Sequence, residues 1–445
     1  MKKFFVLLTC FFIGNSCFSF EIVYPKSTKA LVNADSTFFI GNSGPDSGLK
    51  INGNSVKMNK SGAFAYVVNL KPGDNIFDIE DKNGKQTYVV IRKISNCGCT
   101  INSPKFLKYN VVKNAVVSKD NSPMRETPID GGINRLSHFQ KDIPLVVDGE
   151  NGDFYRVILN DNSKAWLAKR DVTIVDDNSF STPATLSYIE HKEDKDFDYY
   201  IFATNKKVPY VIKEGNPFVV TLYNIEYAED MTHTFEIPLN HKLYGYSGSF
   251  EKDKFVLKIR KAPRDIKNVK VTIDAGHGGS EYGAISCHNI KEKDINFAIS
   301  KYLAQELRSL GIHVVMTRDS DQDVGLQERV NIANKNDATI LISIHGNALP
   351  DGADPNSFRG TSVYYYYPQA KFLAENVLSS LNKIAGTQND KVRQGSLALV
   401  RNTNALSILV EVGYLINPDD SDLLKSSEFQ KKCAKAIAKA IRDSL

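Results

Sequence analysis

The hydrophobic pattern of the chain changes near Val269. Upstream of this point apolar residues alternate or form short runs between turn residues, which is typical of β-strands. Downstream, short apolar runs alternate with segments in which apolar residues recur every three or four positions, as in amphipathic helices. This alternation predicts an α/β domain with a mainly parallel sheet that is covered by helices on both faces. We expect strands at residues 270–274, 312–316, 338–344 and 407–411, another strand that ends at Tyr367, and helices at 295–310, 324–336, 371–384 and 422–445.

The first 19 residues have the three parts of a secretory signal peptide. Lys2 and Lys3 precede an apolar run from residue 4 to residue 13, and small residues follow it at Cys17 and Ser19. A buried N-terminal strand and a lipoprotein anchor at Cys17 are the alternatives, although Asn15 interrupts the small aliphatic residues that an anchor needs. We therefore expect an exported protein of the periplasm or cell envelope, or an extracellular one.

Composition excludes several classes of function. Hydrophobic residues make up 42% of the 445 residues and charged residues 24%, which indicates a folded globular protein of three or four domains. The formal net charge is +5, and removal of Lys2 and Lys3 with the signal segment would lower it by two, to +3. An excess this small does not indicate a nucleic-acid partner. After the signal segment no run approaches the roughly 18 apolar residues of a membrane span, and the oligomeric state stays open.

Polar residues occur where the predicted strands of the last domain end. His277 follows the first of these strands, His345 follows the strand at 338–344, Glu411 ends the strand at 407–411, and Glu292 precedes the first helix. The carboxyl ends of parallel strands meet at one edge of a sheet, where ligands bind. Two imidazoles and one carboxylate are a common ligand set for catalytic zinc. The four residues together predict a metal site, although the sequence alone does not separate a ligand carboxylate from a catalytic one.

Seven short motifs follow one another along this domain. They are Val271–Gly279, Lys291–Asn296, Thr317–Asp319, Leu326–Arg329, Ala333-Asn334, Ile342–Ala348 and Leu409–Asn417. Their content and order resemble the zinc-dependent N-acetylmuramoyl-L-alanine amidases that cut bacterial peptidoglycan. Gly346 stands where alanine is usual in that family, and Ala405 stands where a proline is common.

The resemblance implies the roles of the four residues. His277, Glu292 and His345 would bind a zinc ion, Glu411 would be the catalytic carboxylate, and peptidoglycan would be the partner. The reaction would hydrolyse the amide bond between the lactyl group of N-acetylmuramic acid and L-alanine of the stem peptide. Bound zinc lowers the pKa of water to about 7 and polarises a carbonyl, and a carboxylate that moves the proton contributes about 10²–10⁴ in rate.

Two other functions stay open. The first is another zinc peptidase that acts on cell-wall peptides, which would release a different pair of end groups. The second is a non-enzymatic protein that binds the cell wall, against which the four intact polar positions argue.

The residues before the last domain divide into three all-β modules. The pattern from Ile51 to Asn75 resembles immunoglobulin-like modules, and the pattern from Pro144 to Ala168, with Trp166 in its last strand, resembles bacterial Src-homology-three-like barrels. We expect Trp166 to pack in the barrel core rather than to stack on a ligand. The expected boundaries are a signal peptide at 1–19, an immunoglobulin-like β-sandwich at 20–103, a Src-homology-three-like barrel at 104–178, a β-rich wall-targeting module at 179–266 and the zinc amidase domain at 267–445.

Several other residues have a structural and a functional interpretation. Cys97 and Cys99 would form a bridge or stay inert thiols, because no second cluster at ligand spacing accompanies them. His288 lies near Glu292 in sequence and would be either a surface residue or a residue beside the site. The tyrosines at 364–367 would pack in the core, with sugar stacking as the alternative.

Overall fold

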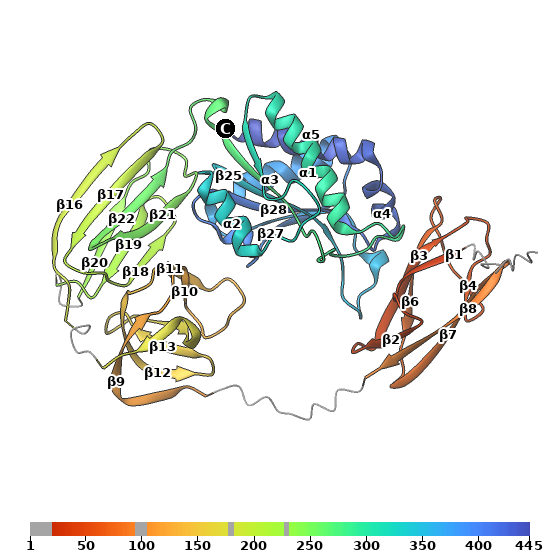
Figure 1. Cartoon of the computed structure of the whole chain (residues 1–445), viewed down its shortest axis with the longest axis horizontal. Helices are drawn as coiled ribbons and strands as arrows, with labels where there is room; N and C mark the ends of the chain where they lie inside the picture. The colour runs from red at the N-terminus through yellow and green to blue at the C-terminus, as the bar shows by residue number, and fades with distance from the viewer. Residues whose placement is uncertain (1–19, 94–104, 177–181, 227–230) are drawn as a thin grey trace, which may run out of the picture.

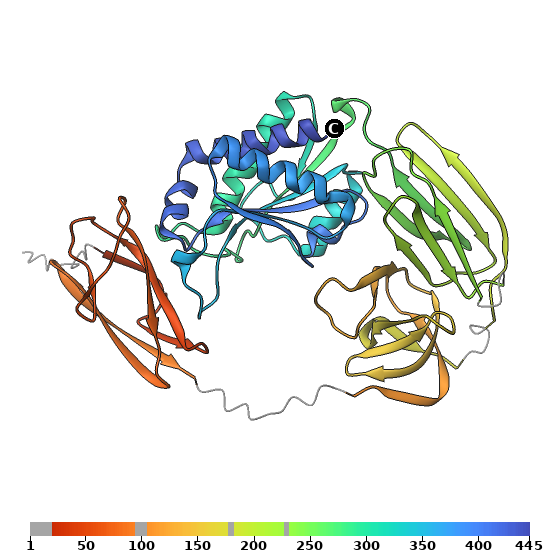
Figure 2. The ribbon, with the colours of Figure 1, turned by 180° about the vertical axis from the view of Figure 1, so that it is seen from behind.

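The computed structural model describes residues 20–93, 105–176, 182–226 and 231–445. The predicted signal peptide, Cys97 and Cys99 lie outside these residues. Three β blocks precede the C-terminal domain: the first is residues 20–93, the second 105–176, and the third 182–226 with 231–260. The C-terminal domain lies between the first block and the third block, and the second block lies next to the third (Figures 1 and 2).

The first block contains two β-sheets. One has the order β1-β3-β6 and the other the order β2-β8-β7-β4-β5. Asn52 and Gly53, both with positive φ, form the two-residue turn between β4 and β5. The strands are β1 (Phe20–Tyr24), β2 (Lys29–Val32), β3 (Ser36–Ser43), β4 (Lys50–Ile51), β5 (Asn54–Ser55), β6 (Ala63–Asn69), β7 (Gly73–Asp81) and β8 (Gly84–Arg92).

The second and third blocks pack against each other through shared apolar contacts. The second is one seven-stranded sheet, and the third contains a four-stranded and a three-stranded sheet. One hydrophobic cluster includes Val117 and Val157 of the second block together with Phe202 and Tyr210 of the third. The second block has β9 (Leu107–Val117), β10 (Ser122–Arg125), β11 (Arg135–Phe139), β12 (Pro144–Asn151), β13 (Phe154–Ile158), β14 (Lys164–Ala168) and β15 (Val172–Ile174), and the third has β16 (Leu186–Glu193), β17 (Phe197–Thr204), β18 (Tyr210–Lys213), β19 (Phe218–Tyr223), β20 (Thr232–Ile237), β21 (Tyr246–Glu251) and β22 (Lys254–Arg260).

The C-terminal domain is built on a six-stranded sheet of order β24-β23-β25-β28-β26-β27. Strands β24, β23, β25 and β28 are parallel to one another, and β26 and β27 are parallel to each other but antiparallel to those four. The elements are β23 (Lys270–Ala275), α1 (Glu292–Ser309), β24 (His313–Met316), α2 (Leu326–Lys335), β25 (Ile340–Asn347), β26 (Thr361–Tyr365), α3 (Lys371–Ser380), β27 (Asn389–Gln394), β28 (Leu406–Tyr414), α4 (Pro418–Leu424) and α5 (Ser427–Ser444).

The two faces of this sheet are covered unequally. Alternate residues of β25, such as Ile342, pack in a large cluster with residues of α1, α3 and α5. Leu341, which points to the opposite face, packs in a smaller cluster with Ala333 of α2 and Leu399 of a short 3₁₀ turn. The larger helical layer therefore lies on one face of the sheet. Among the described residues no helix is long and apolar enough to cross a membrane.

Two sequence-based assignments were incomplete. The helix predicted at 422–445 is two helices, because the Ser426 side chain accepts a hydrogen bond from the Phe429 backbone N–H and begins α5 after α4 has ended. Edge strand β27 was not predicted, since the segment between α3 and β28 lacks a clear apolar alternation. Neither change moves a residue of the predicted metal site.

Candidate active site

The four predicted residues come together at the carboxyl edge of the central strands. His277 follows β23, His345 lies near the end of β25, Glu411 lies in β28, and Glu292 is the first residue of α1. His345 and Glu411 are register partners across the parallel pair β25·β28. One nitrogen or oxygen atom from each of His277, Glu292 and His345 lies within 4.8 Å of the others, so that these three side chains could hold a metal ion.

Glu292 is the centre of this group. Its Oε2 atom lies 3.2 Å from His277 Nε2, and its Oε1 atom lies 2.9 Å from His345 Nδ1. Backbone N–H groups of Ala284 and Gly346 donate to the same carboxylate at 2.9 and 3.2 Å. Burial alone would raise the pKa of Glu292, but the bonds to the two histidines outweigh burial and hold the pKa well below its ordinary value. Glu292 is therefore an anion at neutral pH.

The surroundings of Glu411 raise its pKa, whereas those of Glu292 lower it. Its Oε2 atom is buried and has no hydrogen-bond partner in the described part of the chain. Burial raises the pKa of Glu411 to about 7, with a further rise from the charge of Glu292, although the histidines act against it. A buried polar atom without a partner is costly unless a water, ion or substrate satisfies it. The carboxyl group can therefore gain or lose a proton near neutral pH.

The loop after β23 has a conformation that brings its backbone close to the site. His277 has a φ of 60°, a value that few residues with a side chain adopt and that is concentrated at functional sites. A Cβ atom at Gly276 would lie 2.3 Å from His345 Nε2, and one at Gly283 would lie 2.3 Å from Glu292 Oε2. Only glycine allows the imidazole and the carboxylate to approach so closely at these two positions.

Three buried residues hold this loop, and none of them was assigned a role from the sequence. The Asp274 carboxylate accepts hydrogen bonds from Thr317 Oγ1, Ser343 Oγ and Arg329 Nη1, each at 2.6 Å. Arg329 also donates to the carbonyl of His277 at 3.0 Å, while Arg318 donates to the carbonyl of Ala275 at 2.9 Å. The motifs at 317–319 and 326–329 contain both arginines, but only the tertiary fold reveals what they bind.

Asn296 is a further residue that the sequence did not single out. It lies one turn after Glu292 in α1, and its Nδ2 atom donates to Glu292 Oε1 and to the carbonyl of Gly276, both at 3.2 Å. The helix therefore both supplies the carboxylate and orients it.

His288 lies at a contact between domains and is not part of the metal group. Its Nε2 atom lies 2.6 Å from Asp422 Oδ1, and the same aspartate accepts hydrogen bonds from Ser61 and Asn59 of the first block. The first block also contacts the loop after β25, because the hydroxyl of Tyr24 donates to Asp351 at 2.8 Å. The sequence did not predict this contact.

Apolar residues complete the contact between the first block and the site loops. Phe38 and Ile40 of β3 share a cluster with Cys287, which precedes Glu292, and with Ile416, which follows β28. The first block therefore packs on the segments that lead to two of the four site residues.

All four tyrosines at 364–367 pack in hydrophobic clusters, as expected. Tyr365 packs against the large cluster under α1, α3 and α5, whereas Tyr364, Tyr366 and Tyr367 gather on the other side of β26. Trp166 is partly buried and contacts Phe106 edge to face, with ring centroids 5.9 Å apart.

Comparison with known proteins identifies the family of the C-terminal domain. Residues 271–443 match the family model described as N-acetylmuramoyl-L-alanine amidase. The "germination-specific N-acetylmuramoyl-L-alanine amidase" of Bacillus subtilis is 30% identical over 188 residues, which are 38% of this chain and 77% of that protein. The chain belongs to the N-acetylmuramoyl-L-alanine amidase family.

Two further relatives show how far the similarity extends. The "probable cell wall amidase LytH" of Staphylococcus saprophyticus is 35% identical over 183 residues, which are 40% of this chain and only 59% of that protein. The solved structure of the N-acetylmuramoyl-L-alanine amidase AmiC2 of Nostoc punctiforme is 37% identical, covers 40% of this chain and 96% of that chain, and has a TM-score of 0.38. These matches cover less than half of the chain.

The hydrogen bonds of Arg329 yield a prediction for metal binding by this amidase. Arg329→Lys keeps the charge that faces Asp274 but loses the fork that also holds the His277 carbonyl, so we expect the affinity for a divalent metal ion to fall about 10–100-fold. Titration against a chromophoric chelator measures this change. Arg442→Lys on the exposed face of α5 is the matched control. Wild-type metal affinity in the Arg329→Lys protein would show that the loop does not need this side chain.

Proposed function

We propose that the protein hydrolyses the amide bond between the lactyl group of N-acetylmuramic acid and L-alanine of the peptidoglycan stem peptide. Membership of the amidase family supports the reaction. The observation that carries the assignment of residues is the convergence of two imidazoles and two carboxyl groups of opposite electrostatic character at one sheet edge.

The donor set fits a zinc ion. His277, Glu292 and His345 would hold it, because two imidazoles and one carboxylate leave a position open for water or substrate. Both histidine side chains are partly exposed, at 24% and 19%, so substrate can reach the group. Zinc, when bound, lowers the pKa of water and polarises a carbonyl group.

Glu411 is the proposed proton carrier. Its carboxylate would accept a proton from the attacking water and return it to the nitrogen of the leaving L-alanine, which departs as a neutral amine. Burial raises the pKa of Glu411, which makes its carboxylate a better proton acceptor than an exposed glutamate. The unpartnered Oε2 atom supplies the free acceptor that the step needs.

The remaining residues of the site act by positioning. Arg329 and Arg318 hold the backbone that carries His277, and Asn296 orients Glu292. Such preorganisation lowers the cost of arranging the reacting groups during each turnover.

The location and the N-terminal modules complete the proposal. The protein works in the cell envelope, exported by the signal peptide at residues 1–19, in the periplasm or outside the cell. The β-sandwich at 20–103, the barrel at 104–178 and the β-rich module at 179–266 place the amidase domain at 267–445 on peptidoglycan.

Product analysis of digested peptidoglycan tests the reaction. We expect mass spectrometry to find free stem peptides with L-alanine at the amino end, and glycan strands that carry a lactyl carboxylate. A digest with protein treated with a metal chelator is the control and should contain neither. Cleavage within the stem peptide would identify a different peptidase, and intact material would indicate a protein that only binds the wall.

Substitution of Glu411 separates the proton carrier from the ligands. Glu411→Gln should keep the metal content near that of the wild type and lower turnover at least about a hundredfold, because glutamine cannot accept the proton. His277→Ala and His345→Ala should lower the metal content itself, since each removes a bond to the ion. Metal analysis together with a turnover assay measures both. Loss of metal from Glu411→Gln would make Glu411 a ligand and reopen the role of Glu292, and near-normal activity would exclude the proposed role.

A further inference from the structure

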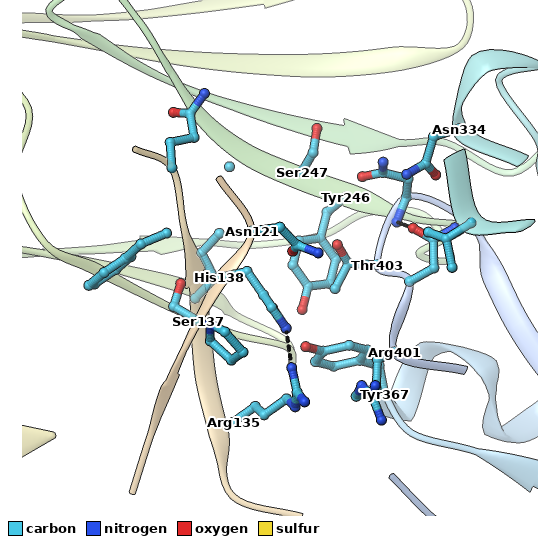
Figure 3. A pocket seen from close by; sticks show the side chains of 18 of the residues that line it. Asn121, Arg135, Ser137, His138, Tyr246, Ser247, Asn334, Tyr367, Arg401 and Thr403 are labelled. Carbon is cyan, nitrogen blue, oxygen red and sulfur yellow. Dashed lines mark hydrogen bonds between the residues drawn. The ribbon is translucent and has the colours of Figure 1, made fainter. Parts of the chain in front are cut away.

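A second candidate site lies where three parts of the chain meet. A cavity of about 620 Å³ is lined by the second block, the third block and the C-terminal domain, and none of the four active-site residues lines it (Figure 3). Residues of β11, β21 and α2 form its walls, together with the segment 398–404 that precedes β28. The volume is in the range of about 300–1,000 Å³ that is typical of small-ligand pockets. The cavity is therefore large enough for a short peptide.

The charged side chains that line the cavity are all positive. Its lining residues include Arg135 and Arg401 but no aspartate, glutamate or lysine. Figure 3 shows the two arginines at the same end of the cavity, beside Tyr367. Burial lowers the pKa of Arg135, and the neighbouring charge of Arg401 lowers it further. Two guanidinium groups held close together without a counter-ion favour an anion between them.

Most donors of these two arginines are unused. Arg135 Nη1 donates to His138 Nε2 at 3.0 Å, and Arg401 Nη1 donates to the carbonyl of Ser396 at 2.7 Å. Within the described ranges Nε and Nη2 of both arginines have no hydrogen-bond partner, and no carboxylate lies within 4.0 Å of either side chain. Asp130, the carboxylate nearest in sequence, is bound by other arginines of the second block. Burial and the arginines lower the pKa of His138 to about 3, so this imidazole is neutral and adds no charge.

Amide side chains also line the cavity. Those of Asn121, Gln140, Gln327, Asn331 and Asn334 can each donate to and accept from peptide groups. The lining therefore combines two cationic side chains with groups that can pair with a peptide backbone.

We propose that this cavity binds a carboxylate-bearing peptide, the stem peptide of peptidoglycan. Arg135 and Arg401 hold a carboxylate of the peptide, and the amide side chains of the walls contact the peptide backbone. The identity of the peptide rests on the proposed function, because the amidase reaction acts on and releases stem peptides. A stem peptide bound here holds the enzyme on its polymer through a peptide that it is not cleaving.

Calorimetric titration of the full chain with a synthetic stem tetrapeptide tests the proposal. This peptide lacks muramic acid and is a product rather than a substrate, so binding is measured without turnover. We expect equal affinity with and without a metal chelator, and a loss of at least about tenfold in each of Arg135→Gln and Arg401→Gln. Arg442→Gln, on the exposed face of α5, should bind as the wild type does. The same peptide with its carboxylates amidated should bind at least about tenfold more weakly.

Several outcomes would overturn the proposal. They are the absence of binding, unchanged affinity in both cavity variants, equal binding of the amidated peptide, and loss of binding on chelation, which would place the peptide at the metal group. Inorganic phosphate that binds as tightly as the peptide would leave an anion site without peptide recognition. Thermal melting shows whether each variant is folded. Where a glutamine variant is not folded, Arg135→Lys or Arg401→Lys replaces it, with an expected weakening of affinity because lysine lacks the planar fork of donors. Failure of the proposed function is seen separately, as the absence of stem peptides in digests by the untreated protein.

Discussion

The buried carboxylate of Asp274 is the interaction on which the active site depends. It lies in β23 and accepts hydrogen bonds from side chains of β25, of α2 and of the segment after β24. The arginine of α2 that binds this carboxylate also holds the carbonyl of His277. A buried carboxylate satisfied by three donors fixes the spacing of these elements, because loss of one donor leaves a costly unpaired group. The position of His277 relative to His345 follows from that spacing.

The two carboxyl groups of the candidate site have opposite electrostatic surroundings. Glu292 receives hydrogen bonds from both histidines and from backbone N–H groups, which keep it ionised. Glu411 is buried with a free oxygen atom, and its pKa rises to about 7. In enzymes, when the surroundings of two carboxyl groups separate their pKa values, one group commonly stays ionised and stabilises charge while the other transfers a proton. The same contrast supports Glu292 as the ligand and Glu411 as the proton carrier.

The sequence predicted which residues come together at the candidate site, but it predicted little of the domain packing. The strand-end positions of His277 and His345 followed from hydrophobic periodicity, which reports local structure well. The roles of Arg318 and Arg329 depend on partners that are distant in the chain, and no local pattern shows such partners. The cavity beside Arg401 and the docking of the first block also depend on how domains meet, which periodicity within each domain does not determine.

Anomalous scattering from crystals of the zinc-loaded full chain tests the central claim most directly. We expect one strong zinc peak bounded by the imidazoles of His277 and His345 and the carboxylate of Glu292, with Glu411 near the ion but outside its ligand set. A peak that is coordinated by Glu411 in place of Glu292, or that lies away from these three side chains, would show that the proposed ligand set is wrong.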